Sequence, residues 1–502
     1  MPMNDEVEEE QSGLILAAED CEPSVFKKIH KFSKYEDKII RSLIAHGPVL
    51  IRGGRGSGKS ALLIEAHNRI HESYSTIFNV YLSLRHLPLL RSQGEEYEKI
   101  FCRLLVASVN NELGRRGHQE LDIAVDFNIG DLQQALIKLS AMLSNRIVLF
   151  FDDAAHIGRE TALEEFFNIF RTISSSTVSC KAAIYPGVTN FGIRFDVYND
   201  ATVIDISRDE RRDDFTDFFV DVINARYPKL LQNTSDSLSR NNTLAWFLGR
   251  AVVGNMRALI FACNRLSEED KKIELPELTK CLIYLSSDYY WSLLDEVAPK
   301  LGKYEPLVEP CRELAEGLFD YATDKKTQIP SEITTSVIIH RDLVQKYSKL
   351  FEILEYAGFI TRREVSRAMK SGGRGSRFIL NLCNLLEKTP NARLTIELLE
   401  TWRKSDETSE IHKNNSILTI NLPELSPEEE LSILKMDIFH IKKSKVYPYG
   451  LTEAKFNILK DVNINTIGEL AETPDAELKE LDSIGDGTIN RIRNVVGQAI
   501  WM

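Results

Sequence analysis

The stretch Val49–Ser60 constrains the fold more than any other part of the chain. It reads V-L-I-R-G-G-R-G-S-G-K-S, and the apolar residues of Ala61–Ile64 follow it. A short apolar strand therefore runs into a glycine-rich turn that matches G-x-x-x-x-G-K-[ST], and a helix begins directly afterwards. Glycines let backbone N–H groups turn inward around a phosphate, because no Cβ blocks the approach. The order strand, loop, helix predicts a phosphate-binding loop in an α/β fold.

The residue types of this loop indicate a nucleotide with its metal ion. We expect Lys59 to reach the β- and γ-phosphates and the Ser60 hydroxyl to bind Mg²⁺. ATP and Mg²⁺ are therefore the predicted cofactors. The residues assigned to the nucleotide-binding loop are Gly53, Gly54, Arg55, Gly56, Ser57, Gly58, Lys59 and Ser60.

A second landmark is Arg146–Asp153, which reads R-I-V-L-F-F-D-D. A strand this continuously apolar is typical of a parallel sheet that is buried on both faces. Its two terminal acids match a Walker B arrangement, in which Asp152 would hold Mg²⁺ as a second metal ligand beside Ser60. Asp153 stands where a general base or water-orienting carboxylate is expected.

Short apolar strands alternate with helices up to about residue 208, which predicts a parallel sheet with helices on both faces. A chain of 502 residues should hold several domains, because single cores stop growing at about 250–300 residues. The predicted division is an acidic disordered tail (1–24), an ATPase core (25–208), a helical lid (209–275), a helical connection with a winged helix (276–404), a linker (405–447) and a small all-α helix-hairpin-helix domain (448–502).

The amino-acid composition excludes fewer classes of binding partner than the motifs do. The formal net charge is -12, but the first 22 residues carry eight acids and no basic residue, so local basic patches decide what the remainder binds. No apolar run approaches the ~18–20 residues that span a bilayer, and the N-terminal residues lack a secretory signal core. The seven cysteines are scattered and form no C-x-x-C pair, which argues against zinc knuckles and a disulfide framework. This pattern predicts a protein of the reducing cytoplasm.

The order of these elements resembles that of the AAA+ P-loop ATPases, most closely the origin-recognition/initiator and STAND-like branches. The resemblance implies a sensor 1 polar residue at Asn190 or Thr189, after the strand that ends at Tyr185. It implies an arginine finger at Arg194, which would act on the nucleotide of a neighbouring subunit in a homo-oligomer. It also implies a sensor 2 arginine at Arg257, in the run Gly254–Leu259 at the start of a lid helix.

Each of these positions also has a plain structural interpretation. Asparagine is common in turns, and Arg194 could pair with Asp196 at the surface. Most members of the family carry glutamate where this chain has Asp153. The aspartate side chain is one methylene shorter, which predicts slow hydrolysis and a switch rather than a motor.

Residues 310–386 read as a winged helix, with helices followed by a hairpin whose tip is Lys370–Ser376. This segment resembles the winged-helix domain that follows the lid in initiator ATPases. Basic residues crowd the hairpin against one acid, Glu364, which favours DNA phosphate contacts, although a protein-docking wing is the alternative. The residues assigned to DNA binding are Arg362, Arg363, Arg367, Lys370, Arg374 and Arg377.

Residues 449–501 resemble the C-terminal domain of the RNA polymerase α subunit, a helix-hairpin-helix fold. The family's main minor-groove arginine falls on Ala454, and Asp486 stands in the hairpin that would meet phosphates. Arg491 and Arg493 could still contact phosphates. DNA binding and protein docking therefore both remain open for this domain.

Two functions fit the sequence. The first is an ATP-binding, slowly hydrolysing switch that controls DNA binding or assembly through the winged helix. The second is a STAND-like signalling or defence ATPase whose wing and C-terminal domain dock protein partners. A processive motor is less favoured because the chain carries no further helicase-type motif.

Overall fold

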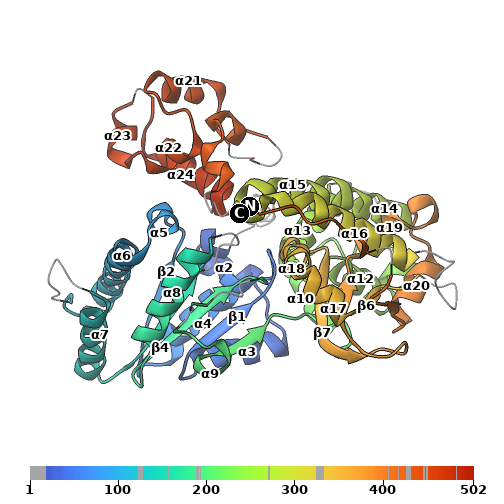
Figure 1. Ribbon diagram of the computed structural model, residues 1–502, viewed down its shortest axis with the longest axis horizontal. Coiled ribbons are helices and arrows are strands. Elements are labelled where there is room, and N and C mark those ends of the chain that lie inside the picture. The colour runs from blue at the N-terminus through green and yellow to red at the C-terminus, as the bar shows by residue number, and fades with distance from the viewer. Residues whose placement is uncertain are drawn as a thin grey trace, which may run out of the picture.

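The computed structural model describes residues 18–121, 128–154, 159–187, 191–192, 194–268, 272–323, 333–404, 406–415, 418–425, 431–444, 447, 450–481 and 483–501. Figure 1 shows a sheet-containing core, a mostly helical lobe beside it, and a small helical domain above both. Among the described residues, no helix is long and apolar enough to cross a membrane.

The core is built on five parallel strands in the order β2-β3-β4-β1-β5. This arrangement confirms the predicted parallel α/β core. It also places β1, the strand that leads into the glycine-rich loop, between β4 and β5. The strands are β1 (Val49–Arg52), β2 (Ile77–Ser83), β3 (Arg146–Asp152), β4 (Val178–Ile184) and β5 (Thr202–Asp205).

Helices cover both faces of this sheet, as the continuous apolar strands require. On β3, Val148 and Phe150 pack against α3 and α4, whereas Leu149 and Phe151 pack against α6, α7 and α8. The helices of the core are α2 (Pro23–Ile29), α3 (Lys34–Ile44), α4 (Lys59–Ser73), α5 (Leu87–Arg91), α6 (Gly94–Arg115), α7 (Ile129–Leu143), α8 (Glu160–Ile173) and α9 (Val197–Asp200).

The lid and the domain after it share one hydrophobic core, which extends from Phe215 to Ile420. The predicted boundary at residue 275 is therefore not a break in packing. The helices of this lobe are α10 (Phe215–Arg226), α11 (Asp236–Ser239), α12 (Thr243–Ala251), α13 (Met256–Ser267), α14 (Leu275–Tyr284), the π-helical η3 (Leu285–Trp291), α15 (Ser292–Val297), η4 (Ala298–Lys300), η5 (Gly302–Leu307) and α16 (Val308–Thr323).

We call the second half of this lobe, residues 308–411, the hairpin domain. Its sheet has the order β7-β8-β6-β9, with β8 antiparallel to both neighbours and β9 parallel to β6. After α16 it contains β6 (Ser336–His340), α17 (Arg341–Lys346), α18 (Ser348–Ala357), β7 (Ile360–Ala368), β8 (Arg374–Leu380), α19 (Leu382–Glu387), α20 (Ile396–Lys404) and β9 (Ser409–Ile411).

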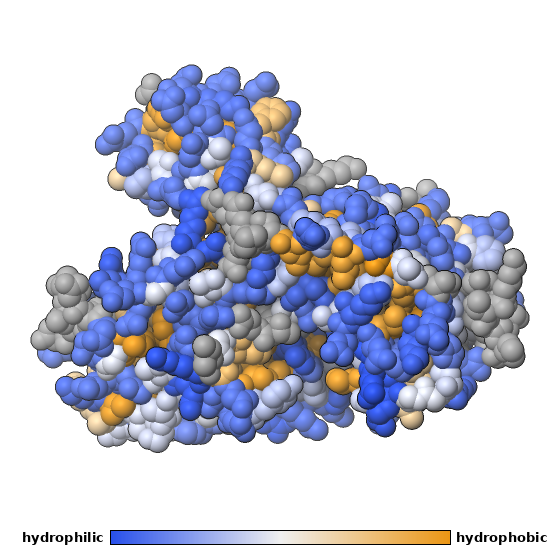
Figure 2. Space-filling model, viewed as in Figure 1, coloured by the Kyte–Doolittle hydropathy of each residue, from blue (hydrophilic) through white to orange (hydrophobic). Residues whose placement is uncertain are grey.

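The C-terminal domain is a separate lobe with a mostly hydrophilic visible surface (Figure 2). Its own core includes the short helices η8 (Ser432–Lys435) and η9 (Ile438–Ile441), so part of the predicted linker packs with it. The same core takes in Leu87 and Leu90 of α5, which joins this domain to the sheet-containing core. Its remaining helices are α21 (Glu453–Asp461), α22 (Ile467–Glu472), α23 (Asp475–Lys479) and α24 (Asp486–Trp501).

Candidate functional site

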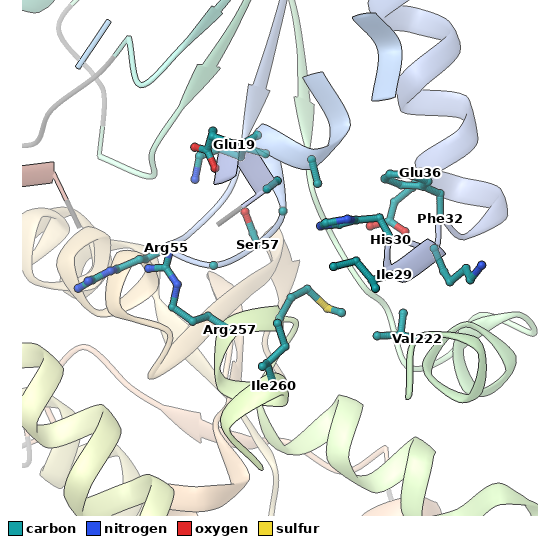
Figure 3. A pocket seen from close by; sticks show the side chains of 18 of the residues that line it. Glu19, Ile29, His30, Phe32, Glu36, Arg55, Ser57, Val222, Arg257 and Ile260 are labelled. Carbon is teal, nitrogen blue, oxygen red and sulfur yellow. The ribbon is translucent and has the colours of Figure 1, made fainter. Parts of the chain in front are cut away.

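The loop between β1 and α4 lines a cleft. Figure 3 shows that Arg55 and Arg257 lie on one side of the loop, whereas Ile29, His30 and Phe32 lie on the other. We call the end near Arg55 and Arg257 the charged end and the opposite end the apolar end, although His30 and Glu36 also lie there (Figure 3). Charged and polar residues that line the cleft include Glu19, Arg55, Lys59, Ser60, Arg85, Asp153 and Arg257, and apolar residues that line it include Ile29, Phe32, Phe218, Val222, Met256 and Ile260.

Lys59, the lysine of the loop motif, is buried, and its ammonium group has hydrogen-bond partners within the protein. Its ammonium group donates hydrogen bonds to the carbonyls of Gly53 and Gly54, at 2.9 and 3.0 Å. It also lies 3.9 Å from the centroid of the Tyr185 ring. Burial lowers the pKa of Lys59 to about 8, against the opposing charges of Asp152 and Asp153. This ammonium is held within the loop that would cradle phosphates.

Asp152 ends β3 with a fully buried carboxylate. The hydroxyl of Tyr81 donates to its Oδ2 at 2.7 Å, and the backbone N–H of Asp153 donates to its Oδ1 at 2.9 Å. Burial raises the pKa of Asp152, and the nearby Glu19 carboxylate adds to the rise. The Ser60 side chain is near enough to the Asp152 carboxylate to oppose the rise of its pKa, so the two predicted metal ligands lie close together.

Asp153 has a left-handed backbone (φ 52°), which aspartate tolerates better than most residues. Its carboxylate forms an ion pair with Arg85 Nε at 2.7 Å, and Arg85 Nη2 also contacts Glu19 at 3.0 Å. Burial raises the pKa of Asp153 to about 7, and the adjacent Asp152 carboxylate contributes further. The carboxylate predicted to orient water is thus tied to an arginine in this arrangement.

These acids fit a hard divalent cation. Carboxylate oxygens of Glu19, Asp152 and Asp153 lie within 4.8 Å of one another, and like charges this close are costly without a cation. Oxygen donors are the ligands that Mg²⁺ prefers. Asp152 and Ser60 would hold the ion, which when bound would neutralise phosphate charge.

Two arginines face the charged end together. Burial lowers the pKa of Arg257, and the neighbouring Arg55 guanidinium lowers it further. Arg55 has one long ion pair, 3.6 Å to Glu296, and its Nε and Nη1 are buried without a hydrogen-bond partner. Two guanidinium groups near each other, one of which has unused donors, are suited to an anion.

The loop itself touches two other elements. The backbone N–H of Arg55 donates to the carbonyl of Tyr356 on α18 at 2.9 Å, and that of Met256 on α13 donates to the Gly56 carbonyl at 2.8 Å. A Cβ at Gly54 would lie 2.7 Å from the Glu355 carbonyl, so only glycine permits this approach. The loop is therefore packed directly on the lid and on the hairpin domain.

The other predicted nucleotide-site residues differ in their placement. Arg257 lines the cleft as expected. Arg194 is exposed and is not among the residues that line it. Asn190 and its alternative Thr189 fall outside the described residues.

The structure brings four further side chains to the loop that the motifs did not reveal. Tyr81 and Arg85 follow from strand pairing, because Ser83 of β2 stands in register with Asp152. Arg208, shortly after β5, donates to the Ser57 and Gly254 carbonyls at 2.8 and 2.9 Å. Glu19 belongs to η1 (Ala18–Asp20), which packs on α4 although its segment reads as an acidic tail.

The basic hairpin is only partly available to DNA. Arg363 is buried and pairs with Glu210 at 2.6 Å, and Arg377 is buried and pairs with Glu364 and Asp406, each at 3.4 Å. Arg362 contacts Glu355 at 3.4 Å, and half-exposed Arg367 contacts Glu364 at 3.2 Å. Glu364 is the only acid within the hairpin, but Glu210, Glu355 and Asp406 approach its strands from other segments. The side chains of Lys370 and Arg374 at the tip are exposed.

In the C-terminal domain, Arg493 is also turned inward. It donates to the carbonyls of Leu470 and Ala471 at the end of α22 and pairs with Asp475 at 2.7 Å. Arg491 is exposed. Of the two predicted phosphate contacts, Arg491 is the one that faces solvent.

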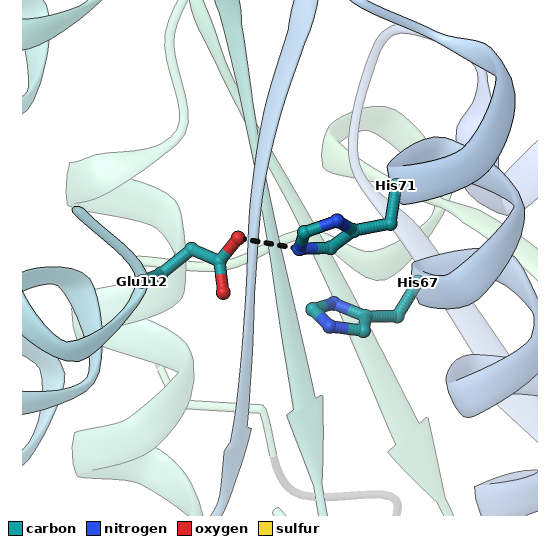
Figure 4. Close-up of side chains that lie close together, drawn as sticks. All are labelled: His67, His71 and Glu112. Atoms are coloured by element: carbon teal, nitrogen blue, oxygen red, sulfur yellow. Dashed lines mark hydrogen bonds and ion pairs between the residues drawn. The ribbon is translucent and has the colours of Figure 1, made fainter. Parts of the chain in front are cut away.

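A second cluster of potential metal ligands joins α4 to α6 (Figure 4). His71 Nε2 lies 2.7 Å from Glu112 Oε1, and His67 is one turn away on α4. The Asn79 amide donates to His67 Nδ1 at 2.7 Å, and Arg116 donates to Glu112 Oε1 at 2.7 Å. We interpret the cluster as a structural network, because its lone pairs and its charge are already used within the protein.

This network predicts an acid-sensitive fold. Burial lowers the pKa of His67 to about 4, so the folded state stays neutral where the unfolded state, with its pKa near 6.5, is protonated. The contribution of His67 to the free energy of unfolding should be constant above pH 6.5 and fall as the pH decreases, by about 2 kcal/mol at pH 5. Urea denaturation at pH 7 and 5 measures this drop, which His67→Gln should reduce and the exposed His118→Gln should not. An equal drop in both variants would contradict the assignment.

Comparisons with known proteins give only distant similarities. No protein-family model matches the chain, and no curated protein matches it. Cdc6p from Pyrobaculum aerophilum is 13% identical over 76% of this chain and 98% of its own, with a TM-score of 0.35. Orc1 from Aeropyrum pernix, solved in complex with DNA, is 12% identical over 72% of this chain and 94% of its own, with a TM-score of 0.27. A STAND protein with a tetratricopeptide repeat sensor from Pyrococcus horikoshii is 13% identical over 74% of this chain and 45% of its own, with a TM-score of 0.26.

Proposed function

We propose that the protein is an ATP-binding and slowly hydrolysing switch of the AAA+ type, whose nucleotide controls how the hairpin and C-terminal domains engage a partner. The observation that carries this proposal is the double contact of the phosphate-binding loop. Arg55 N–H bonds to Tyr356 of α18, and the Gly56 carbonyl accepts from Met256 of α13. A nucleotide that reshapes the loop must act on both elements.

The two ends of the cleft suit the two ends of ATP. Phosphates at the loop would meet Lys59, Arg55 and Arg257. Ser60 and Asp152 would hold the Mg²⁺ that neutralises part of their charge. The base would lie against the apolar end, where Phe32 and Phe218 offer aromatic surface. The ion pair between Arg85 and Asp153 must break before Asp153 can orient a water molecule for hydrolysis. This requirement and the short aspartate side chain both support slow turnover.

We propose that the hairpin domain is a winged helix in a held position. Its elements run helix, strand, two helices and a two-stranded hairpin. In such a fold α18 would be the helix that enters a DNA groove. Here α18 is largely buried, with Glu355 and Tyr356 against the loop and Lys349 donating to the Gly187 carbonyl at 3.3 Å. DNA binding by α18 would therefore require its release from the core.

The alternative is a STAND-like signalling ATPase that docks proteins. The inward ion pairs of Arg363 and Arg377 favour it, because they remove charge from the DNA-facing hairpin. The inward position of Arg493 in the proposed helix-hairpin-helix domain favours it as well. In either case Arg194 is exposed and could reach the nucleotide of a second copy.

Salt dependence distinguishes the two functions. A triple variant with Arg367, Lys370 and Arg374 changed to Gln should lower the dependence of log K on log salt by up to about three units, because each lost phosphate contact removes about one. Fluorescence anisotropy with duplex DNA, in ATP and in ADP, gives this slope. The matched control changes the exposed Lys38, Lys99 and Arg103 of the core to Gln. No DNA affinity at physiological salt, together with nucleotide-dependent oligomerisation, would favour protein docking.

A further inference from the structure

Tyr185 is the first residue after β4, and its ring lies between the loop lysine and the hairpin domain. The Lys59 ammonium is 3.9 Å from the ring centroid on one side. The Tyr356 ring of α18 meets it edge to face on another, with centroids 4.9 Å apart and an interplanar angle of 79°. One side chain therefore contacts both the phosphate-binding lysine and the proposed DNA-reading helix.

Tyr185 also packs against two hydrophobic clusters. The partly buried Tyr185 packs against the hydrophobic cluster of the sheet, which includes Phe151. It also packs against the cluster that the lid and the hairpin domain share, which includes Phe359. The same turn is fixed to α18 at Gly187, whose carbonyl accepts from Lys349. Movement of Tyr185 would therefore change the packing of both hydrophobic clusters.

The ammonium of Lys59 has two competing uses. In this structure it bonds two loop carbonyls and lies over an electron-rich ring, which is a cation–π interaction. Phosphate oxygens of a bound nucleotide would attract the same charge more strongly than a ring does. Binding would therefore withdraw the ammonium from Tyr185 and leave the ring free to part from Tyr356.

We propose that Tyr185 is a positioning residue that couples Lys59 to α18, so that phosphate binding at the lysine weakens the hold of the core on the hairpin domain. The proposal rests on the proposed function, because it requires a nucleotide at the loop. By reciprocity, a contact that favours the held position must oppose nucleotide binding by the same factor.

This reciprocity gives an unusual expectation for Tyr185→Leu. Removal of the ring should tighten ATP binding roughly fivefold, because the competitor for the ammonium is lost. Ordinary structural damage at a buried site would weaken binding instead. Tyr185→Phe keeps the ring face and should resemble the wild type. Isothermal titration with ATP and Mg²⁺ measures both affinities.

Movement of α18 is measured separately, by a spin-label distance. Labels at Tyr198→Cys on α9 and Val365→Cys on β7 use two highly exposed positions, in a Cys21→Ser background whose other six cysteines are buried. ATP with Mg²⁺ should shift this distance in the wild type and in Tyr185→Phe, but not in Tyr185→Leu. Tyr356→Leu should also lose the shift, and Tyr356→Phe should retain it.

The outcomes separate the two levels of inference. If the wild type binds ATP without any shift, the proposed switch is wrong. If the wild type shifts and Tyr185→Leu shifts equally, the coupling role of Tyr185 is wrong. If Tyr185→Leu instead binds ATP poorly and loses the shift, the two Tyr356 variants test the coupling. A shift that is retained in Tyr356→Leu overturns the proposal.

Discussion

Lys59→Ala is expected to lower the affinity for ATP at least ~100-fold, since charge-assisted hydrogen bonds to two phosphates are lost at roughly 1.5–3 kcal/mol each. The effect should be large because the lysine is buried beside two carboxylates, where no other ammonium can replace it. The change also removes the counter-charge of Asp152 and Asp153, which raises the cost of burying them.

Binding of a fluorescent ATP analogue, with and without Mg²⁺, measures this loss. Lys38→Ala is the matched control, because Lys38 is an exposed lysine on α3, the other helix on this face of the sheet. Thermal unfolding of both variants separates lost binding from lost folding. Retained ATP affinity in Lys59→Ala would show that the glycine-rich loop is not the nucleotide site.

Asp152→Asn should abolish Mg²⁺-dependent hydrolysis, with a rate lower by about 100–1000-fold, an effect as large as that of removing one strong electrostatic stabiliser of a transition state. The amide keeps the size of the side chain and can still accept from Tyr81, but it loses the charge that a hard cation requires. Affinity for ATP in EDTA should change much less than affinity in Mg²⁺, because the carboxylate acts through the ion.

Phosphate release under single-turnover conditions measures the rate, and an Mg²⁺ titration gives the change in metal dependence. Asp205→Asn is a suitable control, since Asp205 ends β5, another strand of the same parallel sheet, with an exposed carboxylate paired to Arg52. Tyr81→Phe should lower the rate by no more than about tenfold, because it removes one hydrogen bond to Asp152. A Mg²⁺ dependence in Asp152→Asn equal to that of the wild type would contradict the metal-site assignment.

The glycine-rich loop and the acidic strand end could be predicted because each is a local pattern. Glycines that must adopt positive φ, such as Gly56 and Gly58, are visible in the sequence, and so is a strand apolar on both faces. The approach of Arg257 was also predictable, although only from its resemblance to a lid motif. These features depend on a few neighbouring residues.

The partners of those residues were not predictable in the same way. Glu19 and Asp153 are more than a hundred residues apart and meet through Arg85. Arg363 of the hairpin domain pairs with Glu210 of the lid, and Arg377 pairs with Asp406, which lies 29 residues further along the chain. Count and spacing of basic residues in one segment cannot show which acids will reach them.

Packing across a predicted domain limit is also invisible in a local pattern. The helical pattern placed the end of the lid near residue 275, and side chains from Phe215 to Ile420 form one continuous cluster across that point. The three-residue strand β9 and the attachment of η8 to the C-terminal domain are likewise set by contacts with distant segments. Short elements of this kind carry too little pattern of their own to be recognised.

The shared core of the lid and hairpin domain has a mechanical consequence. That lobe contacts the sheet-containing core at the glycine-rich loop, the core contacts the C-terminal domain through Leu87 and Leu90, and the C-terminal domain contacts the lobe through the hydrogen bond of Ser432 to Glu305. The three parts of the protein are thus connected pairwise. Separation at one of these contacts strains the other two, so the protein should open in a single cooperative step, and a force on one part should also reach the contact between the other two.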